Sequence, residues 1–280
     1  MKVLTKTNEL QQITNQLKLE NRAIGFVPTM GALHQGHISL VEKSTLENKV
    51  TIVSIFVNPT QFDKVEDLEK YPKTIESDIA LLEKTNCDYL FLPSASNIYN
   101  KQIEAKKFSF DGLENEMEGK FRDNHFDGVG TIVKKLFEIA QPTKSYFGEK
   151  DFQQLQIIRK LTEKEQLGIE IIGCSIYREQ DGLAMSSRNS RLTAVQKKEA
   201  PFIYKTLKKV VEKYKKEDLE TISSWVASEF AKNKVLELEY FEIADERTLK
   251  SIDKKSNNKT RAFIAVFADS IRLIDNISLQ

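Results

Sequence analysis

Two of the chain's three histidines, His34 and His37, stand beside Gly31 and Gly36 within residues 28–37, which read Pro-Thr-Met-Gly-Ala-Leu-His-Gln-Gly-His. This stretch follows a short apolar run and precedes an amphipathic segment, so we expect it to join a strand to a helix. Such a junction exposes unpaired backbone N–H groups and the positive end of a helix dipole, which attract phosphate. Glycines let an anion approach the backbone, and imidazoles add hydrogen-bond donors. The pattern therefore predicts a nucleotide site.

Other interpretations of the histidines remain open. With His125 they could form a three-histidine zinc site, although the spacing lacks the glutamate of the H-E-x-x-H pattern. They could also simply cap a helix or pack against it. The chain contains no G-x-x-x-x-G-K-[ST] motif, and Gly128-Val129-Gly130 lacks the third glycine of the dinucleotide fingerprint. Any phosphates must therefore be held by another arrangement.

Three further segments carry clusters of polar groups. The amides of Asn58 and Gln61, after the apolar run 50–57, suit a ligand with hydroxyls, although Asn-Pro can equally form a plain turn. At 148–154 a glycine again follows a predicted strand; Lys150 there could follow a polyphosphate, and Asp151 could cap the next helix. The serines and arginine of 181–189 could clamp an anion or form a linker.

Alternating strands and helices must position these segments. Apolar, β-branched runs predict strands at 23–27, 50–57, 88–92, 144–147 and 170–177. Helical spacing predicts helices at 38–47, 131–140 and 151–166, and Thr74 can cap another that reaches about residue 86. This order predicts an α/β fold with a mostly parallel sheet and helices on both faces. Ligands in such folds bind beyond the carboxyl ends of the strands, so the polar turns should meet at one edge.

The pattern changes after about residue 184. Two helices near 195–216 and 218–233 precede strands near 238–244, 261–267 and 271–275. We therefore expect a nucleotide- and substrate-binding domain at 1–184 and a smaller α+β domain at 185–280, which is placed to act as a lid.

Charge and composition narrow the class of protein. The net charge of +1 gives no argument for nucleic acid or an anionic membrane as a partner. The lysines of 205–216 lie among glutamates on a predicted helix, which favours a solvated face. No apolar run approaches the roughly 20 residues of a membrane span, and the first residues lack a signal peptide's apolar core. Cys87 and Cys174 suit buried, reduced thiols. We expect a cytoplasmic protein.

In order along nearly the whole chain, these segments resemble the pantothenate synthetase, or pantoate–β-alanine ligase, family. The matching motifs are Pro28-Thr29-Met30-Gly31 with His34-x-x-His37, Phe56-Val57-Asn58-Pro59-x-Gln61-Phe62, Tyr71-Pro72-Lys73-Thr74, His125-Phe126-x-Gly128-Val129, Phe147-Gly148-Glu149-Lys150-Asp151-x-Gln153-Gln154, the run 181–189 and Arg272-Leu273-Ile274-Asp275-Asn276. The family belongs to the Rossmann-like nucleotidyl-transferring enzymes with an H-x-G-H signature. One departure, Ala268-Asp269-Ser270 in place of a glycine-containing turn, lies away from the expected site.

The resemblance implies an ATP-dependent ligase that condenses pantoate with β-alanine through pantoyl adenylate, releasing pyrophosphate and AMP. It implies ATP contacts from Met30, Gly31, Ala32, Leu33, His34, Gln35, Gly36, His37, Gly148, Glu149, Lys150, Asp151, Tyr177, Met185, Ser186, Ser187 and Arg188. Asn58, Gln61 and Gln154 would hold pantoate and β-alanine, while His34, His37, Lys150 and Arg188 would be catalytic. The family usually forms homodimers.

The chemistry suits these residues. A carboxylate is already ionised at neutral pH, so adenylation needs alignment and charge stabilisation rather than a base. The resemblance implies that His37 is the proton donor. A role in electrostatic stabilisation would cause the same loss of activity when His37 is replaced. Mg²⁺ would bridge the phosphates. No metal-ligating residue is assigned: Asp78 is a candidate, but its pattern favours an exposed helical aspartate. A nucleotidylyltransferase or a non-catalytic nucleotide sensor are the rival functions.

Overall fold

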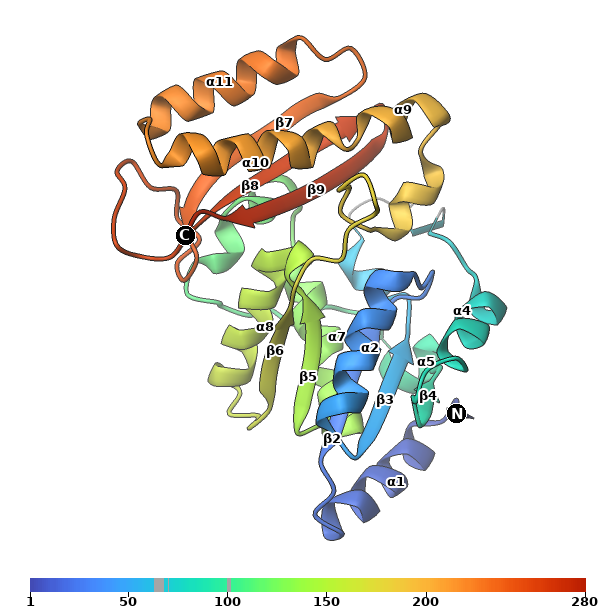
Figure 1. The fold of residues 1–280 in the computed structure, drawn as a ribbon. Helices are drawn as coiled ribbons and strands as arrows, with labels where there is room; N and C mark the ends of the chain where they lie inside the picture. Colours follow the sequence, from blue (N-terminus) through green and yellow to red (C-terminus); the bar gives the residue numbers. More distant parts are fainter. Residues whose placement is uncertain (63–67, 70, 100–101) are drawn as a thin grey trace.

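A six-stranded parallel sheet forms the larger part of the computed structural model, which describes residues 1–62, 68–69, 71–99 and 102–280 (Figure 1). Its spatial order is β1-β4-β3-β2-β5-β6, and every neighbouring pair is parallel. The strands are β1 (Lys2–Leu4), β2 (Ile24–Thr29), β3 (Val50–Ile55), β4 (Tyr89–Phe91), β5 (Lys144–Gly148) and β6 (Glu170–Cys174). The predicted Rossmann-like α/β class is confirmed.

Helices cover both faces of this sheet because its central strands are apolar on both sides. Ile52 of β3 joins a core with α1 (Thr7–Leu19), α7 (His125–Ala140) and α8 (Phe152–Lys164). Val53, the next residue, joins a second core with α2 (Gln35–Glu47) and α4 (Ile75–Leu82). This alternation is the two-residue period of a strand buried on both faces.

The chain reverses its direction of travel across the sheet between β2 and β5. From β2 it moves outward to β3 and then β4, whereas β5 and β6 lie on the opposite side of β2. In open α/β sheets the crevice at such a reversal, beyond the carboxyl ends of the strands, is where ligands bind. The loops that follow β2 and β5 therefore begin side by side at the expected binding edge.

A three-stranded antiparallel sheet lies beyond that edge (Figure 1). Its strands β7 (Glu237–Asp245), β8 (Thr260–Ala268) and β9 (Ile271–Ser278) pack with α10 (Phe202–Tyr214) and α11 (Leu219–Ala231) around a core of their own. Phe263 of β8 joins the core beneath α8 instead, with its ring centroid 5.9 Å from that of Phe152. The antiparallel sheet is thus packed against α8 through apolar side chains.

Several boundaries differ from the sequence prediction. The helix expected at 195–216 is two helices, α9 (Ala194–Glu199) and α10, because Pro201 has no N–H with which to continue α9. β1 and α1 were not predicted, since a three-residue edge strand and a mostly polar helix give weak patterns. Short helices complete the described chain: η1 (Pro59–Gln61), α5 (Ala95–Tyr99), η2 (Leu113–Asn115), α6 (Glu118–Phe121), η3 (Glu149–Asp151) and η4 (Ser187–Arg191).

Thr74 and Asp151 stand at the N-cap positions of α4 and α8, but neither side chain caps its helix, so both capping predictions were wrong. The Thr74 hydroxyl donates to the Asp78 carboxylate instead. Among the described residues no helix has the length and apolar character that a membrane crossing requires.

Candidate active site

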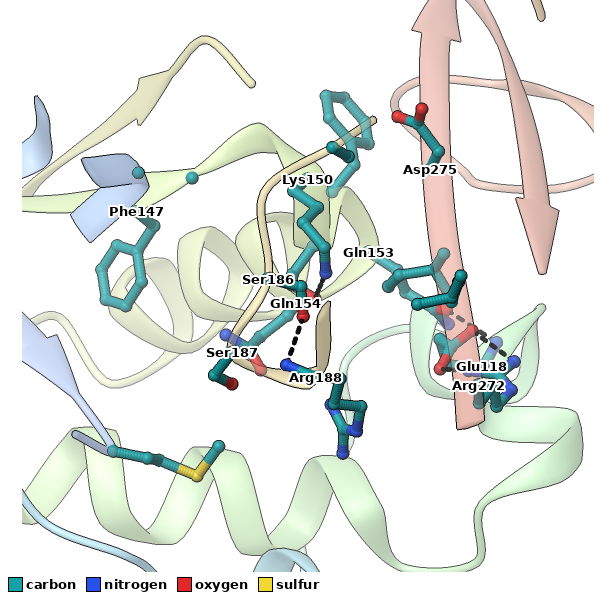
Figure 2. Close-up of a pocket in the computed structure, with 18 of the residues that line it drawn as sticks. Glu118, Phe147, Lys150, Gln153, Gln154, Ser186, Ser187, Arg188, Arg272 and Asp275 are labelled. Carbon is teal, nitrogen blue, oxygen red and sulfur yellow. Dashed lines mark hydrogen bonds and ion pairs between the residues drawn. The ribbon is translucent and has the colours of Figure 1, made fainter. Parts of the chain in front are cut away.

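A cavity of about 600 Å³ lies between the carboxyl edge of the parallel sheet and the antiparallel sheet (Figure 2). It brings together most of the residues singled out in the sequence: Met30, His34, Gly36, His37, Asn58, Gln61, Gly148, Lys150, Asp151, Gln154, Tyr177, Met185, Ser186, Ser187 and Arg188. Five others do not line it: Gly31, Ala32, Leu33, Gln35 and Glu149. Turns from four distant parts of the chain thus share one space.

His34 and His37 hold each other at the start of α2. His34 Nδ1 accepts the Gly36 backbone N–H at 3.2 Å, and His37 Nδ1 accepts the His34 backbone N–H at 3.3 Å. The two rings lie against each other with centroids 4.0 Å apart and planes tilted by 36°. The two histidines therefore cap the start of α2. Because each Nδ1 is an acceptor, the ring proton of each neutral imidazole resides on Nε2, which remains available as a donor.

Both imidazoles are neutral at physiological pH. Burial, with help from the nearby His34 and Lys150, lowers the pKa of His37 to about 3. Burial and Lys150 lower the pKa of His34 to about 4, against a smaller opposing effect of Asp151. These side chains therefore offer neutral N–H donors to the cavity rather than fixed positive charges.

The backbone amides before α2 do not face the cavity, contrary to the expectation from the sequence. The Gly31 N–H donates to Thr29 Oγ1 at 3.3 Å, while the Ala32 and Leu33 N–H groups donate to the two carboxylate oxygens of Asp78 at 3.0 and 2.8 Å. Asp78 is only 1% exposed, so its description as an exposed helical aspartate was wrong. The packing of α4 against this loop buries it.

Gln61 is held from behind by Asn58. The Asn58 amide donates to Gln61 Oε1 at 3.2 Å and to the Gly128 carbonyl at 3.1 Å, while its own oxygen accepts from Tyr99 and Thr60. Gln61 Nε2 donates to the Met30 sulfur. The donors and acceptor of Asn58 are thus engaged within the protein, which makes it a support for Gln61.

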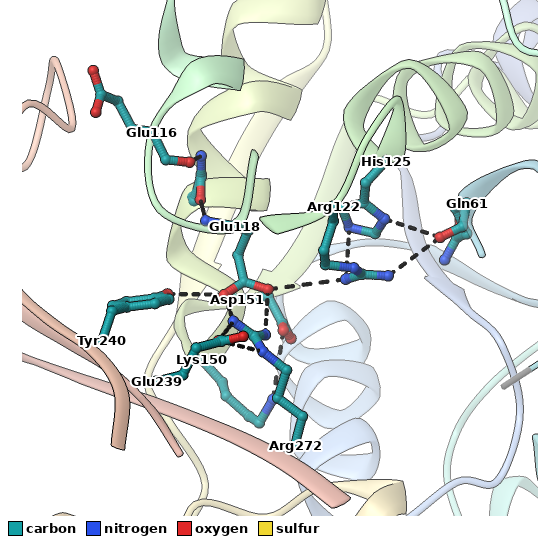
Figure 3. A network of polar contacts seen from close by, with 11 residues as sticks. Gln61, Glu116, Glu118, Arg122, His125, Lys150, Asp151, Glu239, Tyr240 and Arg272 are labelled. Atoms are coloured by element: carbon teal, nitrogen blue, oxygen red, sulfur yellow. Dashed lines mark hydrogen bonds and ion pairs between the residues drawn. The ribbon is translucent and has the colours of Figure 1, made fainter. Parts of the chain in front are cut away.

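His125 supports the same turn from the other side (Figure 3). Its Nε2 lies 3.1 Å from an Arg122 guanidinium nitrogen and its Nδ1 lies 3.0 Å from the Gln61 carbonyl oxygen. An arginine can only donate, so Nε2 accepts and Nδ1 carries the proton. Burial and Arg122 lower the pKa of His125 to about 4.

The three histidines of the zinc alternative make two separate sets of contacts. His125 belongs to the Gln61 turn, whereas His34 and His37 bond to each other at the start of α2. Within the described ranges, no group of three histidine, cysteine, aspartate or glutamate side chains is arranged to hold a metal ion.

The turn after β5 is fixed by the last strand of the chain. The Asn276 amide, on β9, donates to the carbonyls of Glu149 and Lys150 at 2.9 Å each. The Lys150 ammonium lies 3.5 Å from the Asp151 carboxylate, and both side chains line the cavity with Gln154. Ser186 caps the short helix η4: its Oγ accepts the Arg188 backbone N–H at 3.2 Å (Figure 2).

A buried ion-pair network links α6 to the antiparallel sheet at the side of the cavity (Figure 3). Arg272 of β9 binds both carboxylate oxygens of Glu118, at 2.6 and 2.8 Å, and also binds Glu239. The Tyr240 hydroxyl donates to Glu118 at 2.8 Å. Burial opposes ionisation of Glu118, but the hydrogen bonds and charge of Arg272 outweigh it and lower its pKa.

Sequence patterns gave Glu118 no role, and they did not predict the contacts of His125, Arg272 and Asn276, which stand in the quoted motifs. These side chains bond to segments that lie far from them in the chain, and local patterns do not reveal such contacts. Asp275 and Asn276 carry one usable signal: they are adjacent polar residues flanked by Ile274 and Ile277 in the terminal strand. Ser270 also lines the cavity. The turn that departs from the family pattern was expected to lie away from the site, and this expectation was wrong.

Comparison with known proteins connects this geometry to one family. Residues 2–278 match the family model described as pantoate-beta-alanine ligase. The pantothenate synthetases of Christiangramia forsetii and Flavobacterium psychrophilum are 53% and 50% identical to the chain over 282 residues, and both alignments cover 100% of each protein.

Solved structures agree over the full length. The pantothenate synthetase from Thermus thermophilus superposes with a TM-score of 0.93 at 34% identity, covering 100% of this chain and 99% of that one. A pantoate-beta-alanine ligase from Francisella tularensis, complexed with beta-gamma ATP and beta-alanine, gives 0.81 at 36% identity and covers 100% and 98%. The chain is therefore an enzyme of the pantoate–β-alanine ligase family.

Proposed function

We propose that the cavity binds ATP and pantoate together and joins them before β-alanine reacts. A pantoate carboxylate oxygen attacks the α-phosphorus of ATP, and pyrophosphate leaves. The deprotonated amine of β-alanine then attacks the acyl carbon, and AMP leaves with the pantothenate amide formed. The observation that carries this proposal is the single cavity of about 600 Å³, which combines charged donors with neutral amides.

The donors suit the adenylation step. Lys150, Arg188 and the Nε2–H groups of His34 and His37 would offset the negative charge that accumulates on the phosphates. His37 would act as a neutral hydrogen-bond donor, because a pKa of about 3 leaves it without the acidic imidazolium proton at neutral pH. The ATP contacts implied for residues 31–33 would be indirect, since their amides bond within the protein.

The amides suit the smaller substrates. Gln61 and Gln154 reach the cavity from different elements, and each offers both a donor and an acceptor for the hydroxyl and carboxylate groups of pantoate. Asn58 would position Gln61 rather than touch the substrate. The Francisella tularensis relative, which carries beta-gamma ATP and beta-alanine in its solved complex, supports a shared site for nucleotide and amine substrate.

Magnesium fits this site only as a partner of the nucleotide. Mg²⁺ is usually bound by phosphate oxygens, water and one or two carboxylates. Asp78 bonds to the loop before α2. Of the carboxylates that the structure places in the cavity wall, Glu118 and Glu239 pair with Arg272 and Asp275 pairs with Arg178, which leaves the half-exposed Asp151. Bound in this way, the ion would supply charge neutralisation at the phosphates.

The proposal also includes the domain arrangement, the cellular location and the oligomeric state. The C-terminal residues, from 185 onward, would form a domain that covers the cavity, as their separate core and the Glu118–Arg272 contact suggest. Buried free thiols at Cys87 and Cys174 suit a cytoplasmic setting. The homodimer rests on the family resemblance, and light scattering of the purified chain would test it.

Exchange of labelled pyrophosphate into ATP tests the function. With pantoate present and β-alanine omitted, we expect exchange because adenylation is reversible. A nucleotide sensor would bind ATP but show no pantoate-dependent exchange, and a nucleotidylyltransferase would require a phosphorylated acceptor. Either result would refute the proposal.

A further inference from the structure

The loop between β2 and α2 holds Ala32 in a backbone conformation that alanine rarely adopts. Gly31 and Ala32 both have positive φ angles, +85° and +50°. Glycine adopts this left-handed region freely, but in alanine the Cβ atom crowds the backbone. A non-glycine residue keeps such a conformation only where the surrounding structure fixes it. Something must therefore hold Ala32 in place.

The Asp78 carboxylate is that support. Its Oδ2 accepts the Ala32 N–H at 3.0 Å, and its Oδ1 accepts the Leu33 N–H at 2.8 Å. The Thr74 hydroxyl, one helical turn earlier, donates to Oδ1 at 3.1 Å and fixes the carboxylate in turn. Asp78 is 1% exposed, so these bonds form away from water, where they cannot be exchanged for bonds to solvent.

The strained loop leads directly into the two histidines. Ala32 and Leu33 precede His34, which opens α2 and shares the reciprocal cap with His37. The direction in which the loop leaves Ala32 therefore sets where both imidazoles lie at the cavity wall. Because Asp78 also engages two backbone amides that could otherwise face an anion, the imidazole Nε2–H groups become the donors on this side.

We infer that Asp78 is a positioning residue for the nucleotide: by clamping Ala32 and Leu33 it presents His34 and His37 to the triphosphate. This inference rests on the proposed function only in requiring that the cavity bind ATP. Asp78 touches no substrate itself, and its role differs from that of a metal ligand because both its oxygens are already occupied by the protein.

Replacing Asp78 with asparagine tests the clamp. The Asp78→Asn side chain keeps the shape but turns an NH₂ group toward one of the two backbone N–H donors. We expect the dissociation constant for β,γ-methylene-ATP, measured by calorimetry, to rise about tenfold. The dissociation constant for pantoate, whose proposed contacts lie on other loops, should change less than twofold. Glu76→Gln is the matched control, since it removes an exposed carboxylate from the same helical turn and should leave both constants unchanged.

A second substitution separates positioning from general loss of structure. Glycine accepts a positive φ without strain, so adding Ala32→Gly to Asp78→Asn should recover about threefold to fivefold of the lost nucleotide affinity. If Asp78→Asn does not fold, Thr74→Val removes only the hydroxyl that fixes the carboxylate and should weaken nucleotide binding about twofold to threefold. Both variants are compared with wild type by thermal unfolding.

The inference is overturned if folded Asp78→Asn, or folded Thr74→Val where the former is insoluble, binds the nucleotide as wild type does. Parallel weakening of nucleotide and pantoate, without recovery by Ala32→Gly, would also overturn it. These binding measurements do not depend on turnover. A wild-type protein that binds the nucleotide but fails pantoate-dependent pyrophosphate exchange would refute the proposed function and leave the Asp78 result intact.

Discussion

Arg272 of the antiparallel sheet and Glu118 of α6 form a two-pronged ion pair, with guanidinium nitrogens 2.6 and 2.8 Å from the two carboxylate oxygens. The residues are 154 positions apart, and both side chains are largely buried. Glu118 stands in the short helix α6 at the cavity wall, and Arg272 stands in β9. A buried bidentate pair fixes orientation as well as distance, so it sets how the antiparallel sheet sits over the cavity.

Breaking this pair should destabilise the protein more than breaking a more exposed pair that also joins α6 to the antiparallel sheet. Glu118→Gln leaves the buried Arg272 with Glu239 alone, and we expect the free energy of unfolding to fall by about 2–3 kcal/mol. Glu242→Gln removes one of the two carboxylate partners of the more exposed Lys120, which keeps Glu116, and should cost less than about 1 kcal/mol. Urea unfolding of both variants measures the difference. Equal losses would show that the Glu118 pair does not anchor the sheet.

The buried histidines should make folding stability depend on pH. The folded-state pKa values of about 4, 3 and 4 for His34, His37 and His125 all lie below the 6.5 of an unfolded histidine. The unfolded chain therefore binds more protons below pH 6.5, and stability is lost as the pH falls. Between pH 7 and 5.5 each histidine should account for about 1 kcal/mol of this loss.

His37→Gln isolates one of these contributions, because glutamine does not titrate. Urea unfolding at pH 7 and pH 5.5 should show a pH-dependent loss about 1 kcal/mol smaller in the variant than in wild type. The same variant keeps a side-chain N–H donor, so adenylation should largely survive if His37 stabilises charge. Identical pH dependence in both proteins would contradict the neutral assignment, and abolished adenylation in a folded variant would favour proton transfer.

The two glutamines should discriminate between substrates. Gln61→Ala and Gln154→Ala each remove an amide from the cavity wall proposed for pantoate. We expect the KM for pantoate to rise about tenfold or more, with the KM for ATP changed less than about threefold, since one lost hydrogen bond in a desolvated site costs about 1–3 kcal/mol. Steady-state kinetics with each substrate varied in turn gives both values. Parallel increases for the two substrates would remove both residues from the pantoate site.

Much of the fold and of the cavity could be predicted because their signals are local. The apolar strand at 50–55 and the amphipathic helix after Gly36 can each be recognised from a few consecutive residues. Because the strands are parallel, the turns that follow them lie at one edge of the sheet. The lining residues His34, Gln61 and Lys150 lie on such turns, so their meeting follows from topology.

Contacts between distant segments could not be predicted in this way. The sequence suggested free amides before α2, but the carboxylate that takes them, Asp78, lies 45–46 residues away on a helix whose packing no local pattern reveals. The same applies to Asn276, which secures the Glu149–Lys150 carbonyls from the last strand. Sequence patterns placed the donors, whereas tertiary packing determined which of them face the cavity.

Isotope transfer from the acceptor carboxylate tests the central claim most directly. When pantoate labelled with ¹⁸O in both carboxylate oxygens reacts with ATP and β-alanine, the attacking oxygen stays bound to the α-phosphorus after the amide forms. Mass spectrometry should therefore find one ¹⁸O atom in AMP and none in pyrophosphate. Unlabelled AMP, or label in inorganic phosphate, would contradict activation of pantoate by adenylation in this cavity.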